Sequence, residues 1–224
     1  MKIRTLIAGA VGLFVIGVVS LEAADQMTSL YAKPGSKLRL EGTSTIHDWQ
    51  AESKIIGGSI QVGQNFPTEP GQDVKPGKVE AKGEAFITVR SLMSVEKNGS
   101  HYNDTMDETM WKNLKATDHP KIFYRTSDLT LKEVPKSKDE PYLFDSKGEL
   151  VVAGVTNQVS LLLKVLPLAD KKVKISGSLP TKMSNFKVEA EKIGLGIVTF
   201  KTGDDVKFSF DWIVGPRAAS AASK

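Results

Sequence analysis

The residues best suited to chemistry lie in the stretch GTSTIHDW, from Gly42 to Trp49. It sets three hydroxyl side chains beside the neighbouring pair His47 and Asp48. A histidine held by a carboxylate next to a hydroxyl is the arrangement that activates a nucleophile. In an extended chain, however, successive side chains point to opposite faces. We therefore expect His47 and Asp48 to point apart, on a strand where they cannot form a catalytic pair.

Other catalytic and metal-binding patterns are missing from the sequence. The chain has no cysteine, which excludes disulfides, iron–sulfur clusters, thiolate zinc sites and cysteine nucleophiles. It has no G-x-S-x-G elbow, and GLGIVT at 194–199 lacks the third glycine of a dinucleotide fingerprint. The remaining histidines, His101 and His119, show no spacing typical of metal ligands. We therefore expect no metal, no cofactor and no enzymatic activity.

Length and charge describe an ordinary globular chain. The 224 residues are 40% hydrophobic and 25% charged, which fits one domain, or at most two, with a sizeable core. The formal net charge is +4, and basic and acidic residues alternate, as in KVEAKGEA. This pattern indicates a solvated surface and no nucleic-acid partner.

The N-terminus has the pattern of an export signal. MKIR is positively charged, and the apolar run from Leu6 to Val19, about 14 residues, is short for a membrane span. We expect residues 1–23 to be a cleaved signal peptide, with a retained membrane anchor as the alternative. The mature protein would then be periplasmic or secreted, and not an integral membrane protein.

Several segments alternate between apolar and polar residues with a period of two. The segments are KVEAKGEAFITV (78–89), NQVSLLLKV (157–165) and DVKFSFDW (205–212). Alternation of this kind predicts antiparallel strands with one dry and one wet face. Turn-forming residues are expected between strands, at 56–59, 70–77, 145–148 and 202–205. Many short strands with such turns predict an all-β sandwich or barrel.

One segment has helical periodicity instead. In NDTMDETMWKNLKA, 103–116, Met106, Met110 and Leu114 recur every four residues, with acidic residues early and lysines late. Asn103 or Asp104 can cap the N-terminus. We expect a short amphipathic helix that covers one end of the core, with a methionine surface that also suits a flexible apolar ligand.

Four pieces in order resemble the YceI-like, polyisoprenoid-binding family. They are GTSTIHDW, VRSLMSVEKNGSHYNDTMDETMWKNLKATDHPKIFYRTS, GELVVAGVTNQVSLLLKV and KMSNFKVEAEKIGLGIVTFKTGDDVKFSFDW. The resemblance covers about 38–213. It implies an antiparallel lipocalin-like β-barrel with one short helix and an elongated apolar cavity for an isoprenoid chain, in proteins that are bacterial and often periplasmic. The chain differs in having Tyr124 where the family usually has Phe, and in a basic insertion at 135–141.

The candidate ligand-binding residues are the side chains that face inward on the predicted strands, together with those on the apolar face of the helix. An eight-stranded barrel is near the size at which side chains fill the interior or leave room for one small ligand. Periodicity alone favours a filled core, and the resemblance favours a cavity. The candidates are Trp49, Ile87, Val89, Met106, Met110, Leu114, Ile122, Tyr124, Leu161, Leu163, Phe208, Phe210 and Trp212, with His47 at the mouth. For His47 we expect scaffold hydrogen bonds, with contact to a ligand head group as the alternative.

The expected organisation is a signal peptide (1–23), a lead-in segment (24–37), the barrel domain (38–214) and a flexible tail (215–224). The expected function is that of an exported protein that holds a long isoprenoid-type lipid, polyprenyl or quinone, for transport or storage. Two alternatives stay open: an enzyme acting on such a lipid, and a ligand-free structural or interaction barrel. The sequence also leaves a homodimer open.

Overall fold

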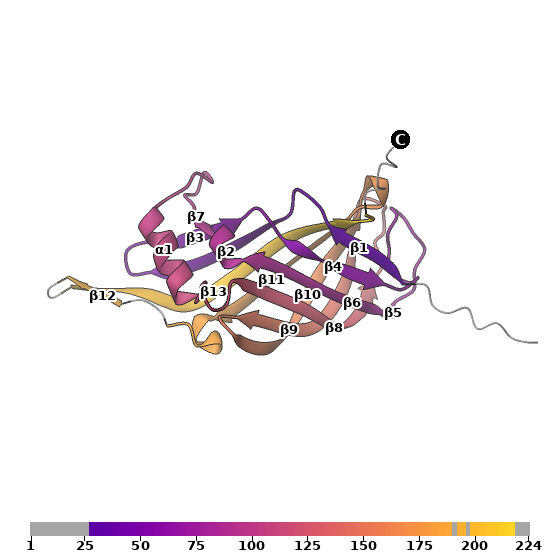
Figure 1. Cartoon of the computed structure of the whole chain (residues 1–224). Helices are drawn as coiled ribbons and strands as arrows, with labels where there is room; N and C mark the ends of the chain where they lie inside the picture. The colour runs from indigo at the N-terminus through magenta and orange to yellow at the C-terminus, as the bar shows by residue number, and fades with distance from the viewer. Residues whose placement is uncertain (1–26, 190–191, 196–197, 218–224) are drawn as a thin grey trace, which may run out of the picture.

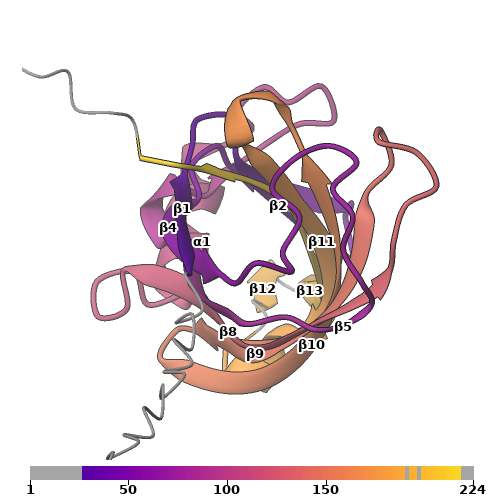
Figure 2. The ribbon, with the colours of Figure 1, turned by 90° about the vertical axis from the view of Figure 1, so that its right-hand side faces the viewer.

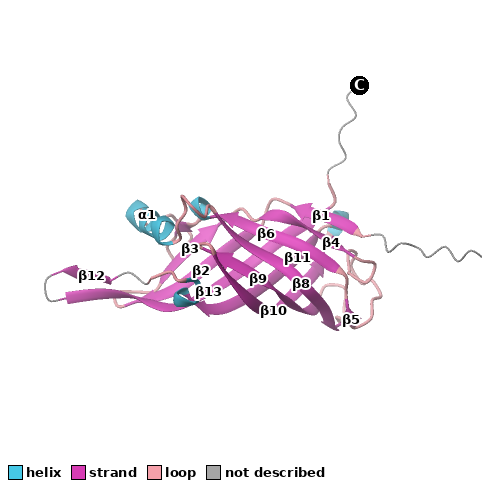
Figure 3. Ribbon diagram, turned by 60° about the horizontal axis from the view of Figure 1, so that its bottom comes forward, coloured by secondary structure: helices cyan, strands magenta, loops and turns pink. Residues whose placement is uncertain are grey.

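The computed structural model describes residues 27–189, 192–195 and 198–217. Strands make up most of this part of the chain, with a short helix at one end (Figure 3). The strands are β1 (Thr28–Ala32), β2 (Lys37–Ser44), β3 (Trp49–Ser53), β4 (Gly57–Val62), β5 (Gly77–Lys78), β6 (Ala81–Thr88), β7 (Met93–Ser94), β8 (Lys121–Glu133), β9 (Tyr142–Val152), β10 (Val155–Pro167), β11 (Val173–Lys182), β12 (Lys192–Leu195) and β13 (Val198–Gly215). The helices are α1 (Asp104–Asn113) and the 3-10 turns η1 (Val89–Ser91), η2 (Ala169–Lys171) and η3 (Met183–Phe186).

The strands close into a barrel, because the long strand β13 pairs along both of its edges. In the described chain the ring runs β1-β4-β6-β8-β9-β10-β11-β13, with every pairing antiparallel, and the β1–β13 pairing completes it. On the edge of β13 that faces away from β11, β1 pairs only with the last residues, and β2 pairs with the earlier ones. β2 pairs in turn with β3, and β3 pairs with β7. Viewed from its end, the molecule is a ring of strands (Figure 2). The expected all-β, antiparallel lipocalin-like barrel is confirmed.

The alternation read from the sequence sets the two faces of the wall. In β10, Leu161 and Leu163 are buried, whereas Leu162 between them is 53% exposed. In β13, Phe208 and Trp212 are buried while Lys207 is exposed. Since side chains alternate along a strand, the apolar set of each long strand faces the barrel interior.

The helix α1 forms where the sequence predicts it and lies at the end of the barrel from which the β12–β13 hairpin projects (Figure 1). Asn103 is the N-cap, and its side chain accepts a hydrogen bond from the backbone N–H of Met106. This satisfies one of the free donors of the first turn. Among the described residues α1 is the single α-helix, as expected.

Three predicted turns are wrong. Residues 145–148 lie within β9, residues 202–205 within β13, and β4 begins inside 56–59. In two of these segments a glycine is required by close packing. A side chain at Gly148 would overlap the ring of Tyr124, and one at Gly57 the ring of Phe86. The actual β9–β10 turn is Ala153–Gly154, where both residues have positive φ.

The barrel also begins earlier than the sequence suggested. Strand β1 lies inside the expected lead-in segment 24–37, and it pairs with β4 and β13. The expected signal peptide and most of the expected tail lie outside the described residues. In the part of the chain that the structure describes, no helix has the length and apolar character needed to cross a membrane.

Candidate functional site

The barrel interior holds an inner cavity. Its empty volume is about 960 Å³, counting the space at its opening, and only a small part of that space is wide enough for a water molecule, so the cavity is narrow. Eight of the predicted residues line it: Ile87, Ile122, Tyr124, Leu161, Leu163, Phe208, Phe210 and Trp212. The interior is therefore partly hollow, which periodicity alone did not favour.

The inner cavity is also lined by residues that sequence reasoning missed. Phe66, from the connection between β4 and β5, lines the cavity and packs on Phe144 with the ring centres 5.7 Å apart. Ile56, just before β4, and Ile60, within β4, also line it. No period-two run marks Phe66, because it lies in a connection between strands, and no other sequence pattern identifies it as a lining residue.

The inner cavity has few polar groups. The hydroxyl of Tyr124 forms a 2.7 Å hydrogen bond with the hydroxyl of Ser146 on β9, a buried residue. Burial raises the pKa of Tyr124, and the hydrogen bond to Ser146 opposes part of that increase. Tyr124, where the resemblance led us to expect Phe, therefore contributes a neutral, hydrogen-bonded hydroxyl to an otherwise apolar wall.

A second, outer chamber lies under α1 at the mouth of the barrel. Its empty volume is about 1490 Å³, including open space, and Phe208 lines both this chamber and the inner cavity. Phe208 therefore borders both spaces. The remaining predicted residues found in the outer chamber are His47, Trp49, Met106, Met110 and Leu114.

Val89 is the one predicted lining residue that lines neither space. It is fully buried in the core, but it opens the 3-10 turn η1 because β6 ends one residue earlier, at Thr88. The turn ends the alternation that the sequence suggested would continue to this position. Val89 therefore contributes to the core and not to the cavity surface.

The stretch 42–49 is not one continuous strand, which corrects the opening prediction. β2 ends at Ser44 and β3 begins at Trp49, so residues 45–48 form the turn of a hairpin. The Ser44 hydroxyl accepts from the backbone N–H groups of Ile46 and His47 and donates to the carbonyl of His47. The predicted strand therefore breaks where a serine offers the backbone its own hydrogen bonds.

His47 forms scaffold hydrogen bonds at the mouth, on the surface of the molecule. Its Nδ1 donates to the backbone carbonyl of Asp48 at 2.8 Å. In the neutral imidazole Nε2 is then an acceptor, and the hydroxyl of Tyr102 lies 3.3 Å from it. The side chain of Asp48 takes no part, so these residues form no His–Asp catalytic pair.

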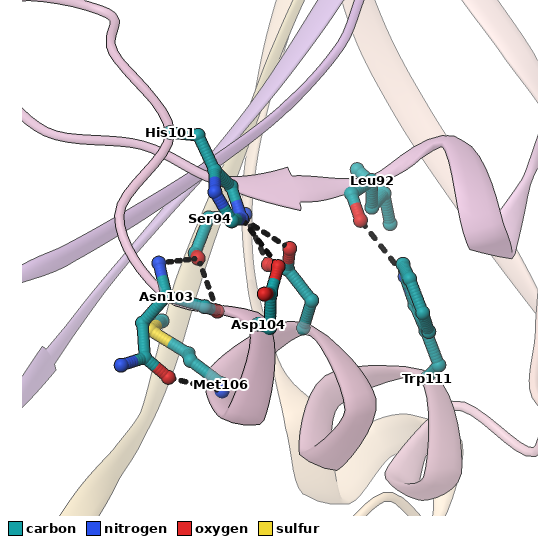
Figure 4. A network of polar contacts seen from close by, with 8 residues as sticks. Leu92, Ser94, His101, Asn103, Asp104, Met106 and Trp111 are labelled. Carbon is teal, nitrogen blue, oxygen red and sulfur yellow. Dashed lines mark hydrogen bonds and ion pairs between the residues drawn. The ribbon is translucent and has the colours of Figure 1, made fainter.

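A buried carboxylate, that of Asp107, holds the loop before α1 in place, and Figure 4 shows its neighbours Ser94, His101 and Asp104. Asp107, 1% exposed, accepts from the backbone N–H of Ser94 at 2.5 Å and from His101 Nε2 at 2.7 Å. Asp104 lies 3.6 Å from the same His101 nitrogen. His101 has no spacing typical of metal ligands in the sequence, and the structure places it beside these two carboxylates. Both oxygens of Asp107 already accept protein hydrogen bonds, which makes this cluster an anchor for the mouth.

The fold can be compared with known proteins. A family model described as YceI-like domain matches residues 35–213. The crystal structure of Burkholderia cenocepacia BcnA is 17% identical, with a TM-score of 0.54, over 80% of this chain and 95% of that chain. A polyisoprenoid binding domain from Saccharophagus degradans, implicated in plant cell wall breakdown, is 11% identical, with a TM-score of 0.57, over 85% of this chain and 99% of that chain.

At these identities the two structures establish a shared fold. The comparison with curated proteins found no match.

Proposed function

The chain belongs to the YceI-like domain family, and from this premise we propose that it binds the apolar chain of a long isoprenoid-type lipid inside the barrel. The observation that carries the proposal is the narrow inner cavity, lined almost entirely by apolar side chains from strands all round the ring. Such a cavity fits a thin branched hydrocarbon. Each buried CH₂ contributes roughly 0.8 kcal/mol, so affinity needs few polar contacts.

The outer chamber extends the path for such a chain. Met106 and Met110 line it from α1, and Phe208 borders both this chamber and the inner cavity. Methionine side chains adapt to a flexible apolar ligand. A chain longer than the inner cavity therefore has an apolar surface to follow toward the mouth.

The name of one structural relative agrees with this proposal. The domain from Saccharophagus degradans is described as polyisoprenoid binding, and it shares this fold. We extend that ligand class to this chain because its own cavity has the matching shape and polarity.

We further propose that the protein is exported and serves as a carrier or store. The N-terminal pattern of a basic start and a short apolar run supports export. A binding role agrees with the described site, in which the hydrogen bonds of His47 and His101 go to scaffold groups. Turnover of an isoprenoid lipid by the purified protein would overturn the binding role.

A matched pair of neighbouring leucines tests the cavity. The full-length protein is expressed and purified without detergent, its lipids are extracted, and isoprenoid lipid per mole of protein is measured by mass spectrometry. Leu163→Glu places a charge on the cavity wall, and Leu162→Glu places the same charge on the outer face of the same strand. We expect isoprenoid lipid on the wild type and on Leu162→Glu, and none on Leu163→Glu.

A second variant covers the case in which Leu163→Glu fails to fold. Ala85 lines the inner cavity from β6, and Ala85→Phe fills it with an apolar side chain. We expect this variant to keep the circular dichroism of the wild type and to lose most of the lipid. A folded Ala85→Phe protein that retains full lipid, or a wild type that carries none, would contradict the proposed site.

A further inference from the structure

The hairpin formed by β12 and the start of β13 has one apolar and one polar face. Its register pairs Ile193 with Phe200 and Leu195 with Val198. Directly paired residues, and residues two apart on one strand, lie on the same face of a two-stranded ribbon. These four apolar residues therefore share one face. The other face carries the pairs Lys192–Lys201 and Gly194–Thr199.

The outer part of this ribbon leaves the barrel wall. β2 ends at Ser44, which is paired with Thr202, and the backbone N–H of the next residue, Thr45, donates to the carbonyl of Lys201 at 2.9 Å. From there toward Val198, β12 is the one strand that pairs with β13 in the described chain. The hairpin projects past the end of the barrel (Figure 1 and Figure 3). Because an isolated two-stranded ribbon is only marginally stable in water, its apolar face calls for a partner.

Exposed apolar side chains of the mouth lie near the base of the hairpin. Ile46 follows Thr45 and is 63% exposed, and Tyr102, also exposed, lies beside His47 of the same turn. Ile46 and Tyr102 both line the outer chamber. The other large apolar side chains that are exposed in the described chain line neither space, and they are Ile55, Val134 and Leu162. Apolar exposure is therefore gathered where a lipid would enter the outer chamber.

The lysine pair indicates that the partner is anionic. Lys192 and Lys201 are directly opposite each other. Like charges in directly opposed positions destabilise a ribbon, and an anionic partner offsets this repulsion. Val198 is three residues from Lys201, about 10 Å at the usual rise per residue. With the lysines at the level of lipid phosphates, the apolar end of the ribbon therefore reaches the hydrocarbon of a bilayer.

We propose, building on the proposed function, that the hairpin docks the mouth of the barrel on an anionic lipid surface. The apolar face enters the outer hydrocarbon, and the lysine pair contacts lipid phosphates. Ile46 and Tyr102 lie at the interface, a position that suits an aromatic ring with a polar tip. The outer chamber then opens onto the bilayer, and an isoprenoid chain passes between bilayer and barrel without crossing water.

The absence of cysteine from the chain allows a site-specific test. Leu195→Cys and the control Leu162→Cys, on the outer face of β10, each supply a single thiol for the polarity-sensitive dye NBD. The labelled proteins, shown by intact mass to share one N-terminus, are mixed with phosphatidylcholine vesicles containing phosphatidylglycerol. We expect the emission of the hairpin label to rise by about twofold or more, and to be quenched by nitroxide-labelled lipid. The label on β10 should show neither effect.

Charge variants measure what each face contributes. We expect Leu195→Asp to weaken binding to the anionic vesicles at least about tenfold, and the control Leu162→Asp by less than about twofold. Lys192→Gln and Lys201→Gln should each weaken it about fivefold, as the contribution of one lysine near an anionic surface predicts. On vesicles of phosphatidylcholine alone, the two lysine variants should bind as the wild type does. Vesicle co-sedimentation measures all four, and circular dichroism confirms that each is folded.

Binding of the isoprenoid hydrocarbon phytane to delipidated protein, without vesicles, separates this inference from the proposed function. We expect Leu195→Asp to bind phytane within about twofold of the wild type, since docking is not needed for a ligand supplied in solution. A wild type that binds no phytane would contradict the proposed function.

The docking inference fails on its own in three cases, while the lipid-binding function stands. The first is an equal response of the two labels to vesicles, or equal vesicle binding by Leu195→Asp and Leu162→Asp. The second is a hairpin label that brightens with protein concentration in the absence of vesicles, which would mean that a second copy of the chain covers the apolar face. The third is loss of phytane binding in folded Leu195→Asp, which would mean that the hairpin closes over its own barrel.

Discussion

The inner cavity and the outer chamber of this barrel are built in different ways. The inner cavity is lined mainly by alternate residues of long, mutually paired strands, such as Leu161 and Leu163 of β10. The outer chamber is assembled from a hairpin turn, a helix and the ends of strands, and Asp107 helps to hold them together. A wall of repeated apolar positions depends on many weak contacts, whereas the mouth depends on a few specific hydrogen bonds. The two regions should therefore respond differently to single substitutions.

The sharpest test of this contrast is Asp107→Ala. The substitution leaves the buried backbone N–H of Ser94 without its acceptor and His101 without its nearer partner, so we expect unfolding free energy to fall by about 2–4 kcal/mol. Urea unfolding measures the loss. Hydrogen exchange should show faster exchange in α1 than in β9 and β10.

The control is Asp104→Ala, which removes an exposed carboxylate next to the same histidine and should cost about 0.5 kcal/mol or less. Equal losses for the two variants, or uniform acceleration of exchange across the barrel, would show that the mouth has no anchor of its own.

The barrel wall is tested by truncating one apolar side chain. Leu163→Ala should lower the unfolding free energy by about 2 kcal/mol, the low end for a buried leucine, because its side chain already borders open space. Leu162→Ala, on the outer face, should change it by less than about 0.5 kcal/mol. Thermal unfolding of the delipidated proteins measures both. A larger effect at Leu162 would reverse the assignment of the two faces.

Tyr124, the hydrogen-bonded residue within the apolar wall, should have a smaller effect on the unfolding free energy, and this effect should depend on pH. Tyr124→Phe removes the hydrogen bond to Ser146 and should cost about 1 kcal/mol near neutral pH. Burial raises the pKa of Tyr124 above that of an unfolded tyrosine. The neutral phenol is therefore favoured in the folded state, and this contribution is complete below the unfolded pKa, about 10.

Above that pH, the stability that Tyr124 contributes should decline until the folded pKa is passed. The wild type should therefore lose stability faster than Tyr124→Phe as the pH rises above about 10. Chemical unfolding across this range measures the difference. Parallel curves for the two proteins would mean that Tyr124 titrates normally in the folded state.

The smallest effect is expected at the rim of the mouth. Tyr102 is 44% exposed, and its hydroxyl lies within hydrogen-bonding distance of His47, which is also exposed. Water can replace either partner, so Tyr102→Phe and His47→Ala should each change the unfolding free energy by less than about 0.5 kcal/mol. Thermal unfolding checks this. A loss comparable to that of Asp107→Ala would mean that the hairpin turn helps to anchor the mouth.

Most of the fold was readable from sequence because strands with one dry face leave a period-two record. That record identified the inward residues of β10 and β13, and the capped four-residue stripe identified α1. The prediction of turns failed where a glycine inside a strand was interpreted as part of a turn. Gly148 and Gly57 lie within strands because an aromatic ring from a neighbouring strand occupies the space of a side chain. Sequence alone does not reveal which ring will lie across which glycine.

The sequence by itself determined the all-β class, the amphipathic helix and which face of each long strand is apolar, because these depend on neighbours in the chain. The tertiary structure decided the rest. It showed that the interior is partly hollow, which depends on how side chains from opposite walls meet. It also brought His101 to Asp107 across a loop, and left the N–H of Trp212 buried without an acceptor among the described residues. Packing and hydrogen-bond partners of this kind arise only when distant segments are brought together.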